Sequence, residues 1–512
     1  MPNVTSFLDI GAARSGDPAL ILPSTGESYT MQDLLDATCS LGSLLLSHGV
    51  SKGEKITICL ESSAGYLVSY FAAWRIGAVA VPANRVSTRD ELAYAVSDSG
   101  SRVIITDPEG SEMASSIPGV TVIVAGGEAP EGTVPWRLFP DERVWIEPAN
   151  CLGSDLCHIQ YTSGTTGRPK GAMLTQGGWM AALDAEAEVL GLRPDDIYLG
   201  IYPMGHVGIS WGIAALKAGA SFVVMERFDL EAYLRLTGEY RVTILAGMPP
   251  VIHSLLTSSP GTEERLASVR EIISGGGPLH PDTWKPFHER FGIPIINAYG
   301  LSETIVVGTG TAIRAEDYPL ADKFLSVGHP VGYSEVRIVD TEDPSKVLPT
   351  GTEGEIALRG PSVALGYYGM VEETAAVFLP SGWFLTGDIG YLDENGMLSI
   401  TDRKKDMIIM SGWKIYPTEV ENVLLRHPDI ADAAIFGVPD PRRGEIPVAA
   451  VVPKDNHSIT AEDLIAYCRR HLAGYKVPRE VQIVDHLPRV NGWKLMRKSL
   501  RQTYSQKIRQ VP

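Results

Sequence analysis

The chain of 512 residues is poor in cysteine, with five in total, and none of them has the spacing of a metal site or of a disulfide framework. It has no apolar run of about 18 residues, so no membrane-spanning helix is predicted. Its first residues lack the basic and then apolar pattern of a secretory signal. These absences predict a protein of a reducing compartment, and the cytoplasm is the expected location.

Positive charge is also scarce, because the chain has 44 Lys and Arg against 61 Asp and Glu, a net charge of −17. Residues 401–512 are the exception, with 19 basic against 13 acidic side chains, so the acidity lies in the first 400 residues. An acidic body does not suit a nucleic-acid binder. The basic C-terminal segment suits small polyanions such as ATP and coenzyme A, but ordinary solvated charge would give the same count.

Short apolar runs alternate with helical patterns through the first two-thirds of the chain, which predicts layered α/β architecture with largely parallel sheets. A length of 512 residues predicts at least two domains. Glycine-rich turns separate short strands from 336 to 400, which predicts a smaller β-rich subdomain. The expected strands are 55–60, 79–82, 103–106, 121–125, 156–161, 196–201, 242–246 and 270–274, and the expected helices are 63–76, 89–98, 179–190, 230–239 and 281–291.

Residues 161–174 are the most informative stretch, and they read Tyr-Thr-Ser-Gly-Thr-Thr-Gly-Arg-Pro-Lys-Gly-Ala-Met-Leu. Glycines let successive backbone N–H groups point into one concavity, hydroxyls add donors, and Lys170 adds a cation, a combination suited to a polyphosphate. The spacing is not that of the common phosphate loop, which requires Gly, four residues and then Gly-Lys-Ser/Thr. A simple surface turn is the alternative for such a composition.

This segment resembles the phosphate loop of the adenylate-forming superfamily, which contains acyl-CoA synthetases, adenylation domains of peptide synthetases and firefly luciferase. Further segments resemble the superfamily in the same order along the chain: Ser274–Leu279, Asn297–Thr304, Gly382–Asp388, Ser411–Glu419 and Pro488–Arg497. The resemblance implies that a carboxylic acid is activated with ATP as an acyl-adenylate and is then passed to a thiol. It implies ATP, Mg²⁺ and coenzyme A as the partners of an acid–CoA ligase.

The resemblance also implies the site residues. Lys494 falls at the catalytic lysine, Glu303 at the carboxylate associated with Mg²⁺, with Thr166 beside the metal, Tyr299 at the adenine, and Asp388 and Arg403 at the ribose. Trp493 departs from the superfamily, which has glycine there, while Gly492 lies one place early. The complete set for ATP and AMP is Thr162, Ser163, Gly164, Thr165, Thr166, Gly167, Lys170, Gly275, Gly276, Gly277, Asn297, Ala298, Tyr299, Gly300, Ser302, Asp388, Arg403 and Lys494.

The segment Tyr202–Gly208 resembles the one that carries a gating residue near the substrate carboxylate, and His206 is its expected occupant, although a core histidine is the alternative. The acyl pocket is expected at His206, Ile209, Met248 and Gly277. The coenzyme A segment is expected at Ser411, Gly412, Trp413 and Lys414. Lys405 is the expected pivot of a hinge at 403–405, between a large N-terminal domain, 1–402, and a small mobile α+β domain, 406–512.

Three functions stay open at this point. A stand-alone acid–CoA ligase, acting as a monomer or homodimer, is the first. The second is an adenylation enzyme that loads a carrier protein, which is expected on a separate chain because no Ser-bearing carrier segment follows the C-terminal domain in this sequence. The third is a family member without catalytic activity, against which the joint presence of Lys170, Glu303, Asp388 and Lys494 argues. The acid itself, whether fatty, branched, cyclic or aryl, is not specified.

Overall fold

The structure is a computed structural model that describes residues 3–13, 16–126, 129–139, 143–162, 168–277, 279–314, 317, 326–454, 459–490 and 494–509. Its contacts divide the chain into two compact units. The first contains Met1–Val336 and Ala357–Leu385, and the second contains Arg337–Ile356 and Thr386–Pro512. The predicted hinge lies inside the second unit in this division, and the predicted domain limits 1–402 and 406–512 stay a prediction.

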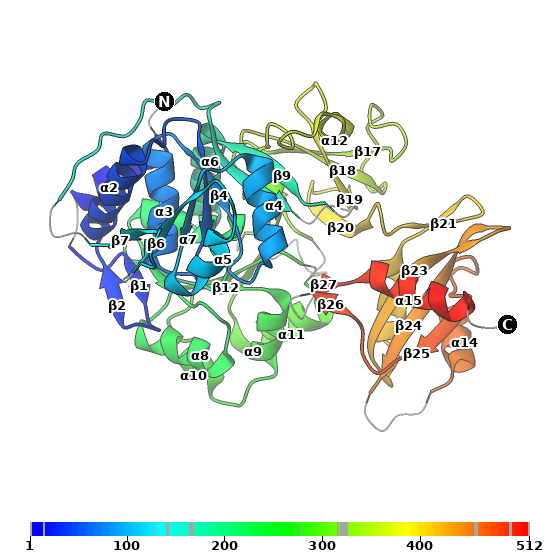
Figure 1. Ribbon diagram of the computed structural model, residues 1–512. Helices are drawn as coiled ribbons and strands as arrows, with labels where there is room; N and C mark the ends of the chain where they lie inside the picture. Colours follow the sequence, from blue (N-terminus) through cyan, green and yellow to red (C-terminus); the bar gives the residue numbers. More distant parts are fainter. Residues whose placement is uncertain are drawn as a thin grey trace. The chain divides into compact units, whose positions relative to one another are not determined.

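Two largely parallel sheets build the first unit, which confirms the α/β class (Figure 1). The seven-stranded sheet is parallel except for its last pair and has the order β7 (Val134–Trp136), β6 (Thr121–Ala125), β5 (Val103–Thr106), β3 (Lys55–Cys59), β4 (Val79–Pro82), β8 (Leu156–Thr162) and β9 (Lys170–Thr175). The nine-stranded sheet has the order β16 (His329–Pro330), β15 (Val306–Ala312), β14 (Ile295–Leu301), β13 (Glu271–Ser274), β12 (Ile244–Gly247), β10 (Ile197–Gly200), β11 (Ser221–Val224), β1 (Leu20–Leu22) and β2 (Glu27–Tyr29).

Helices cover both sheets of the first unit. They are α1 (Ser6–Ala12), α2 (Met31–Ser47), α3 (Ala64–Arg75), α4 (Arg89–Ser99), α5 (Ser111–Ser115), α6 (Gln176–Val189), α7 (Ser210–Ala218), α8 (Leu230–Glu239), α9 (Pro249–Leu256), α10 (Thr262–Arg265), α11 (Pro281–Phe291) and α12 (Val371–Val377), with short 3₁₀ turns η1 (Pro108–Gly110), η2 (Val207–Ile209) and η3 (Ser302–Thr304). The bounds of β4, β5, β6, α8 and α11 are those predicted from the sequence.

Helix α3 is buried along its whole length, because it packs on the seven-stranded sheet and on other helices. Its Trp74 ring lies 4.8 Å from the Trp179 ring of α6, and α6 also contacts β15 of the second sheet. Helix α3, on the seven-stranded sheet, therefore packs against α6, which packs on the nine-stranded sheet. A helix that is apolar on all sides, such as α3, is typical of the interior of a large domain.

A four-stranded sheet follows, in the order β17 (Glu335–Val339), β18 (Gly354–Arg359), β19 (Phe384–Leu392) and β20 (Leu398–Arg403). It confirms the predicted strands between 336 and 400. Helix α12 lies in the same stretch and was not predicted. Its seven residues include Glu372 and Glu373 in the first turn and no buried side chain, so it lacks the apolar face by which a helix is found in a sequence.

The second unit is α+β, as predicted for the C-terminal part. Its main sheet has the order β22 (Trp413–Ile415), β21 (Ile408–Met410), β24 (Gly444–Pro453) and β23 (Ile430–Asp440), with β25 (Glu480–Ile483) beside β24. Side chains of β23 alternate between two cores: Ile435 faces the core that includes Val420 of α13 (Pro417–Leu425) and Leu464 of α14 (Ala461–His471), and Phe436 faces Tyr504 of α15 (Arg497–Arg509). This alternation is the two-residue period of a strand.

Candidate active site

The stems of the predicted phosphate loop are strands β8 and β9, which form an antiparallel hairpin at the edge of the seven-stranded sheet. Thr162 pairs with Lys170 at the loop end of the hairpin, and the Thr162 hydroxyl donates to the Lys170 carbonyl at 3.4 Å. The hairpin therefore fixes both ends of the loop. The predicted residues Ser163, Gly164, Thr165, Thr166 and Gly167 lie outside the described residues.

Helix α4 holds both stems of this hairpin. The Tyr161 hydroxyl, at the end of β8, donates to Asp98 at 2.6 Å, and the Tyr94 hydroxyl donates to the Pro169 carbonyl at 3.1 Å. Burial, and then the bond to Asp98, raise the pKa of Tyr161 well above its usual value. The helix starts at a capping box formed by Thr88 and Glu91, which fixes its first turn.

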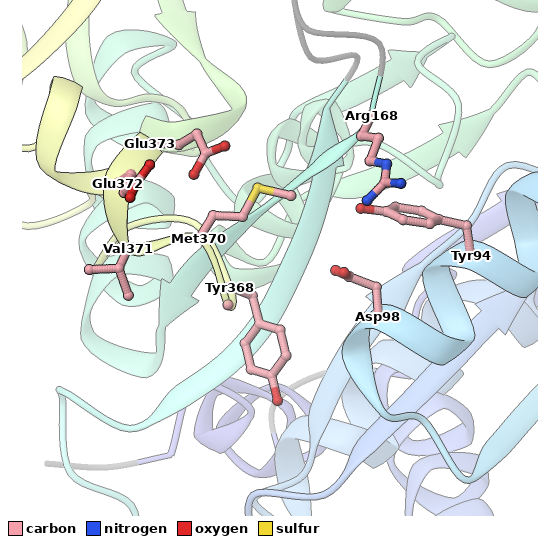
Figure 2. Close-up of a pocket in the computed structure, with 9 residues that line it drawn as sticks. Tyr94, Asp98, Arg168, Tyr368, Met370, Val371, Glu372 and Glu373 are labelled. Atoms are coloured by element: carbon pink, nitrogen blue, oxygen red, sulfur yellow. The ribbon is translucent and has the colours of Figure 1, made fainter.

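A cavity of about 460 Å³ lies beside the hairpin, and Figure 2 shows the side chains around it. Tyr94 and Asp98 of α4 lie on one side, with Arg168, and the chain from Tyr368 to Glu373 lies on the other. Sequence reasoning missed Tyr94 and Asp98, because their contacts with the loop stems cross 75 and 63 positions of the chain. The helix itself was predicted, but no local pattern indicated which of its side chains face the hairpin.

Lys170 and Glu303, predicted at the phosphates and at the metal, contact one and the same side chain. The Tyr367 hydroxyl donates to Glu303 Oε1 at 2.9 Å, and the Lys170 ammonium lies 4.9 Å from the centre of the Tyr367 ring. Glu303 is 8% exposed, so its carboxylate lies in a largely dry setting. The structure thus brings two predicted site residues together, through a tyrosine that the sequence analysis did not identify.

The predicted adenine segment has a backbone that explains its glycine. A Cβ on Gly300 would lie 1.7 Å from the Val306 carbonyl oxygen, so only glycine fits at this β-bulge. Ile305 and Val306, just after Glu303, both have φ of 50°, which is costly for β-branched residues. Such strain persists only where neighbours impose it, and it is frequent at ligand sites. Here the Thr304 hydroxyl donates to the Val306 carbonyl at 2.8 Å.

The remaining nucleotide residues of the first unit lie at the ends of neighbouring strands. Tyr299 and Ala298 are buried in β14, and Asn297 donates to the Ser326 carbonyl at 3.0 Å. Strand β13 pairs in parallel with β14, so Gly275, Gly276 and Gly277 follow the end of the adjacent strand. Ligands of open α/β sheets bind outside the carboxyl ends of such strands. The roles assigned to these residues and to Ser302 stay predictions.

The predicted acyl segment has His206 exposed and Ile209 only 2% exposed. Met248, partly buried, precedes α9. A Cβ on Gly205 would lie 3.2 Å from the Ala83 carbonyl oxygen and 3.3 Å from the Tyr66 hydroxyl. Close packing therefore explains Gly205 without any bound acid.

Three buried side chains hold the backbone that leads to His206. The Tyr70 hydroxyl donates to the Met204 carbonyl at 2.9 Å, and the Gln160 amide donates to the Gly205 carbonyl at 3.2 Å. His158 contacts Gln160 at 3.2 Å and stacks on Tyr70 and Trp179. Burial lowers the pKa of His158 to about 3, so its ring is neutral at ordinary pH.

In the second unit, the two predicted ribose contacts lie next to each other. Asp388 of β19 pairs with Arg403 of β20, and the Arg403 guanidinium lies 3.2 Å from the Asp388 carboxylate. Asp388 is 5% exposed, whereas the Arg403 side chain is 49% exposed. Lys404 forms an ion pair of 2.6 Å with the buried Glu355, and this pair fixes the start of the segment that contains the exposed Lys405.

The predicted coenzyme A segment is a tight hairpin between β21 and β22. Met410 pairs with Trp413, and Ser411 and Gly412 form the two-residue turn with φ of 52° and 83°. Positive φ at both turn positions favours glycine at one of them, whatever the segment binds. Trp413 stacks on Tyr475 with ring centres 4.7 Å apart, and Lys414 donates to Thr341 at 2.7 Å.

Lys494 lies in β27 (Lys494–Leu495), which pairs with β26 (Arg489–Val490). Gly492 and Trp493 lie outside the described residues. Three residues beyond Lys494, Arg497 forms bonds of 2.7 and 2.8 Å with the carboxylate of Glu421 and donates to the Ile435 carbonyl at 3.1 Å. Burial raises the pKa of Glu421, although the charge of Arg497 opposes this shift.

The residues present fit a magnesium ion held with a polyphosphate rather than a protein cage. Among the described residues, no group of three or more His, Cys, Asp or Glu side chains could hold a metal ion. Mg²⁺ usually takes one or two carboxylates together with waters and substrate phosphates. Glu303 offers the carboxylate of that set, and Lys170, near the same tyrosine, suits the phosphates that would supply the other oxygens. No described helix is both long and apolar enough to cross a membrane.

The sequence profile described as "AMP-binding enzyme" matches residues 9–368, and the profile "AMP-binding enzyme C-terminal domain" matches residues 419–492. 4-Coumarate–CoA ligase 5 of Oryza sativa subsp. japonica is 33% identical over 96% of this chain and 92% of its own length. Feruloyl-CoA synthase of Amycolatopsis sp is 34% identical over 96% and 97%. 2-Succinylbenzoate–CoA ligase of Bacillus cereus is 34% identical over 93% and 94%.

Solved structures of several enzymes also match the fold of this chain over nearly its whole length. The ATP-bound MatB from Rhodopseudomonas palustris has a TM-score of 0.88 at 29% identity and covers 99% of this chain and 100% of that one. The amide bond synthetase McbA from Marinactinospora thermotolerans has a TM-score of 0.87 at 27% identity, over 98% and 99%. The anthranilate CoA ligase AuaEII with anthranoyl-AMP has a TM-score of 0.84 at 26% identity, over 98% and 97%.

Proposed function

Because the chain belongs to the AMP-binding enzyme family, we propose that it activates an aromatic carboxylic acid with ATP as an acyl-adenylate, releasing pyrophosphate, and then transfers the acyl group to coenzyme A, releasing AMP. Its class is that of the AMP-forming acyl-CoA synthetases, which use ATP, Mg²⁺ and coenzyme A. The proposal adds the chemical class of the acid and the residues that carry each step.

The observation that carries the proposal is the meeting of Lys170 and Glu303 at Tyr367. A lysine at the end of a hydroxyl- and glycine-rich loop suits the phosphates of ATP. A buried carboxylate beside it suits the cation that accompanies them. When bound, Mg²⁺ neutralises charge on the phosphates that leave as pyrophosphate.

The adenylation step needs a cation because the acid and the nucleotide are both anions. Two like unit charges about 4 Å apart repel by roughly 4 kcal/mol at an effective dielectric constant near 20. Removing this repulsion is worth on the order of a thousandfold in rate. We assign this role to Lys494, as a fixed charge between the carboxylate and the α-phosphate. No general base is needed, because the carboxylic acid is already ionised near pH 7.

The other assignments follow the motif positions. Tyr299 would stack on the adenine, and Asp388 with Arg403 would bind the ribose hydroxyls. For the thiol step, rotation at Lys405 would withdraw Lys494 and present the segment with Gly412 to coenzyme A. The 3.2 Å contact between Arg403 and Asp388 supports the ribose assignment, because it orients one of the two carboxylate oxygens.

An aromatic acid is favoured by the names of the relatives. Coumarate, ferulate and succinylbenzoate carry a benzene ring, and the ligases named for them match over nine-tenths of the chain. The wall of the pocket is assigned to His206, Ile209, Met248 and Gly277.

A pyrophosphate-release screen tests the proposal. The panel contains cinnamic, benzoic, medium-chain fatty, branched and dicarboxylic acids, each with and without coenzyme A. We expect ATP- and acid-dependent pyrophosphate release, highest with aromatic acids, and an acyl-CoA product only with coenzyme A. Higher pyrophosphate release with a fatty acid than with the aromatic acids would refute the proposal that the substrate is an aromatic acid. Acid-dependent pyrophosphate release without any acyl-CoA product in the presence of coenzyme A would refute the acceptor, and no release with any acid would refute the enzyme.

A further inference from the structure

We propose that Tyr367 is a positioning residue. It fixes the positions of the Lys170 ammonium and of the Glu303 carboxylate, and so couples ATP binding to Mg²⁺ binding. The inference rests on the proposed function, because it takes Lys170 and Glu303 as the phosphate and metal residues. Its basis is that one side chain makes a specific contact with each of them, through two different chemical groups.

The hydroxyl contact orients the carboxylate. Tyr367 donates to Glu303 Oε1 at 2.9 Å, and both side chains are at most 9% exposed. A hydrogen bond to a charged group is stronger in such a setting than in water. The hydrogen bond therefore restricts the orientation of the carboxylate before any cation arrives.

The ring contact positions the ammonium. The Lys170 Nζ lies 4.9 Å from the centre of the Tyr367 ring, within the range of a cation–π interaction. A lysine side chain has four rotatable bonds, and a fixed aromatic surface narrows the positions of its head group. The Phe378 ring packs against Tyr367 edge to face, with centres 5.4 Å apart, which fixes the tyrosine ring in turn.

The backbone around Tyr367 is tied to both partners. Tyr367 forms a bridge with Ala172, two residues from Lys170 on β9, and Leu365 donates to the Met173 carbonyl at 2.9 Å. At its other end the same segment is bound to η3, because the Ala364 N–H donates to the Glu303 carbonyl at 2.8 Å. Residues 364–368 thus join the strand of the lysine to the turn of the carboxylate.

Two substitutions separate the two contacts. Tyr367→Phe keeps the ring beside Lys170 and removes the hydroxyl from Glu303, whereas Tyr367→Leu removes both contacts. Tyr333→Phe is the control for the loss of a tyrosine hydroxyl, since this side chain is 85% exposed and does not line the cavity beside the hairpin. Thermal unfolding without ligand checks that each variant is folded. Affinity for ATP is measured by calorimetry, in EDTA and in saturating Mg²⁺, so the readout is binding and does not depend on turnover.

In the wild type, Mg²⁺ is expected to tighten ATP binding. In Tyr367→Phe this tightening should fall by about ten- to a hundredfold, the range expected for one hydrogen bond to a charged group, while binding in EDTA stays the same. Tyr367→Leu should show the same loss and, in EDTA, binding about threefold weaker, from the missing cation–π contact. Tyr333→Phe should match the wild type in both conditions.

The outcomes that overturn the inference differ from those that overturn the function. If wild-type protein binds ATP and Tyr367→Phe shows the same Mg²⁺ effect within twofold, the coupling role is wrong and the proposed function stands. If Tyr367→Phe weakens binding equally in EDTA and in Mg²⁺, the hydroxyl has a general structural role and the inference is also wrong. If wild-type protein binds no ATP, the proposed function fails and the inference fails with it.

Discussion

The hydroxyl of Tyr161 donates a hydrogen bond of 2.6 Å to Asp98, and this bond joins the end of β8 to helix α4. Tyr161 is the last residue but one of the strand that leads into the predicted phosphate loop. The bond therefore restricts the stem of a loop whose proposed task is to surround the phosphates of ATP.

Tyr161→Phe should raise the KM for ATP by about fivefold, because one hydrogen bond to a carboxylate is lost and the loop must be ordered by the ligand instead. The KM for the acid should change by less than twofold. Steady-state kinetics with each substrate varied in turn would measure both constants. Tyr333→Phe serves as control, because its side chain is 85% exposed and its hydroxyl supports no loop. Equal changes in both KM values would contradict a role specific to the phosphate loop.

Buried His158 predicts an acid-linked loss of stability. Burial lowers its pKa to about 3 in the folded protein, against the ordinary value of 6.5. The folded state therefore binds fewer protons than the unfolded state between these values, and stability falls as the pH decreases from 6.5 towards 3. At pH 5 this group alone should cost about 2 kcal/mol of unfolding free energy relative to pH 8.

Denaturant unfolding of the wild type and of His158→Gln at pH 8 and pH 5 measures this effect. The variant is expected to be less stable than the wild type at pH 8, because it loses stacking on Tyr70 and Trp179. The difference between the two proteins should shrink by about 2 kcal/mol at pH 5. A difference that is the same at both pH values would show that the pKa of His158 is not lowered in the folded protein.

Arg497 and Glu421 form a buried ion pair close to Lys494 in the chain, with side chains 16% and 12% exposed. Arg497→Met leaves the Glu421 carboxylate buried without its partner, and we expect a loss of about 3 kcal/mol of stability of the second unit. Arg489→Met breaks the more exposed pair with Asp432 and should cost less than about 1 kcal/mol. Differential scanning calorimetry would compare the two variants, and equal losses would contradict this account.

Most of the fold could be predicted from the sequence, because alternating strands and helices leave short, regular apolar runs. Strand β4 and helix α11 have the predicted bounds. Helix α12 was missed because none of its residues is buried, so its sequence has no apolar stripe. The grouping of 337–356 with residues 386–512 could not be predicted, since it depends on contacts between segments that are not continuous in the chain.

The motifs identified the candidate site residues, whose roles stay predictions, but not the side chains that hold these residues in place. Lys170 and Glu303 were identified, but Tyr367 was not, because the hydrogen bond to Glu303 crosses 64 positions. Gln160 was missed for the same reason, as its bond to Gly205 crosses 45 positions. Two glycines of the motifs are explained by the structure without a ligand. Gly205 is required by close packing, and Gly412 is favoured by the positive φ of its turn.

The central claim is that Lys494 supplies the charge that lets an acid attack the α-phosphate of ATP. The direct test measures the two half-reactions of Lys494→Ala separately, as acid-dependent pyrophosphate release and as acyl-CoA formation from supplied acyl-adenylate. The account predicts a loss of about two to three decades in the first half-reaction and a nearly unchanged second. Equal losses in both half-reactions, or an unaffected first one, would contradict it.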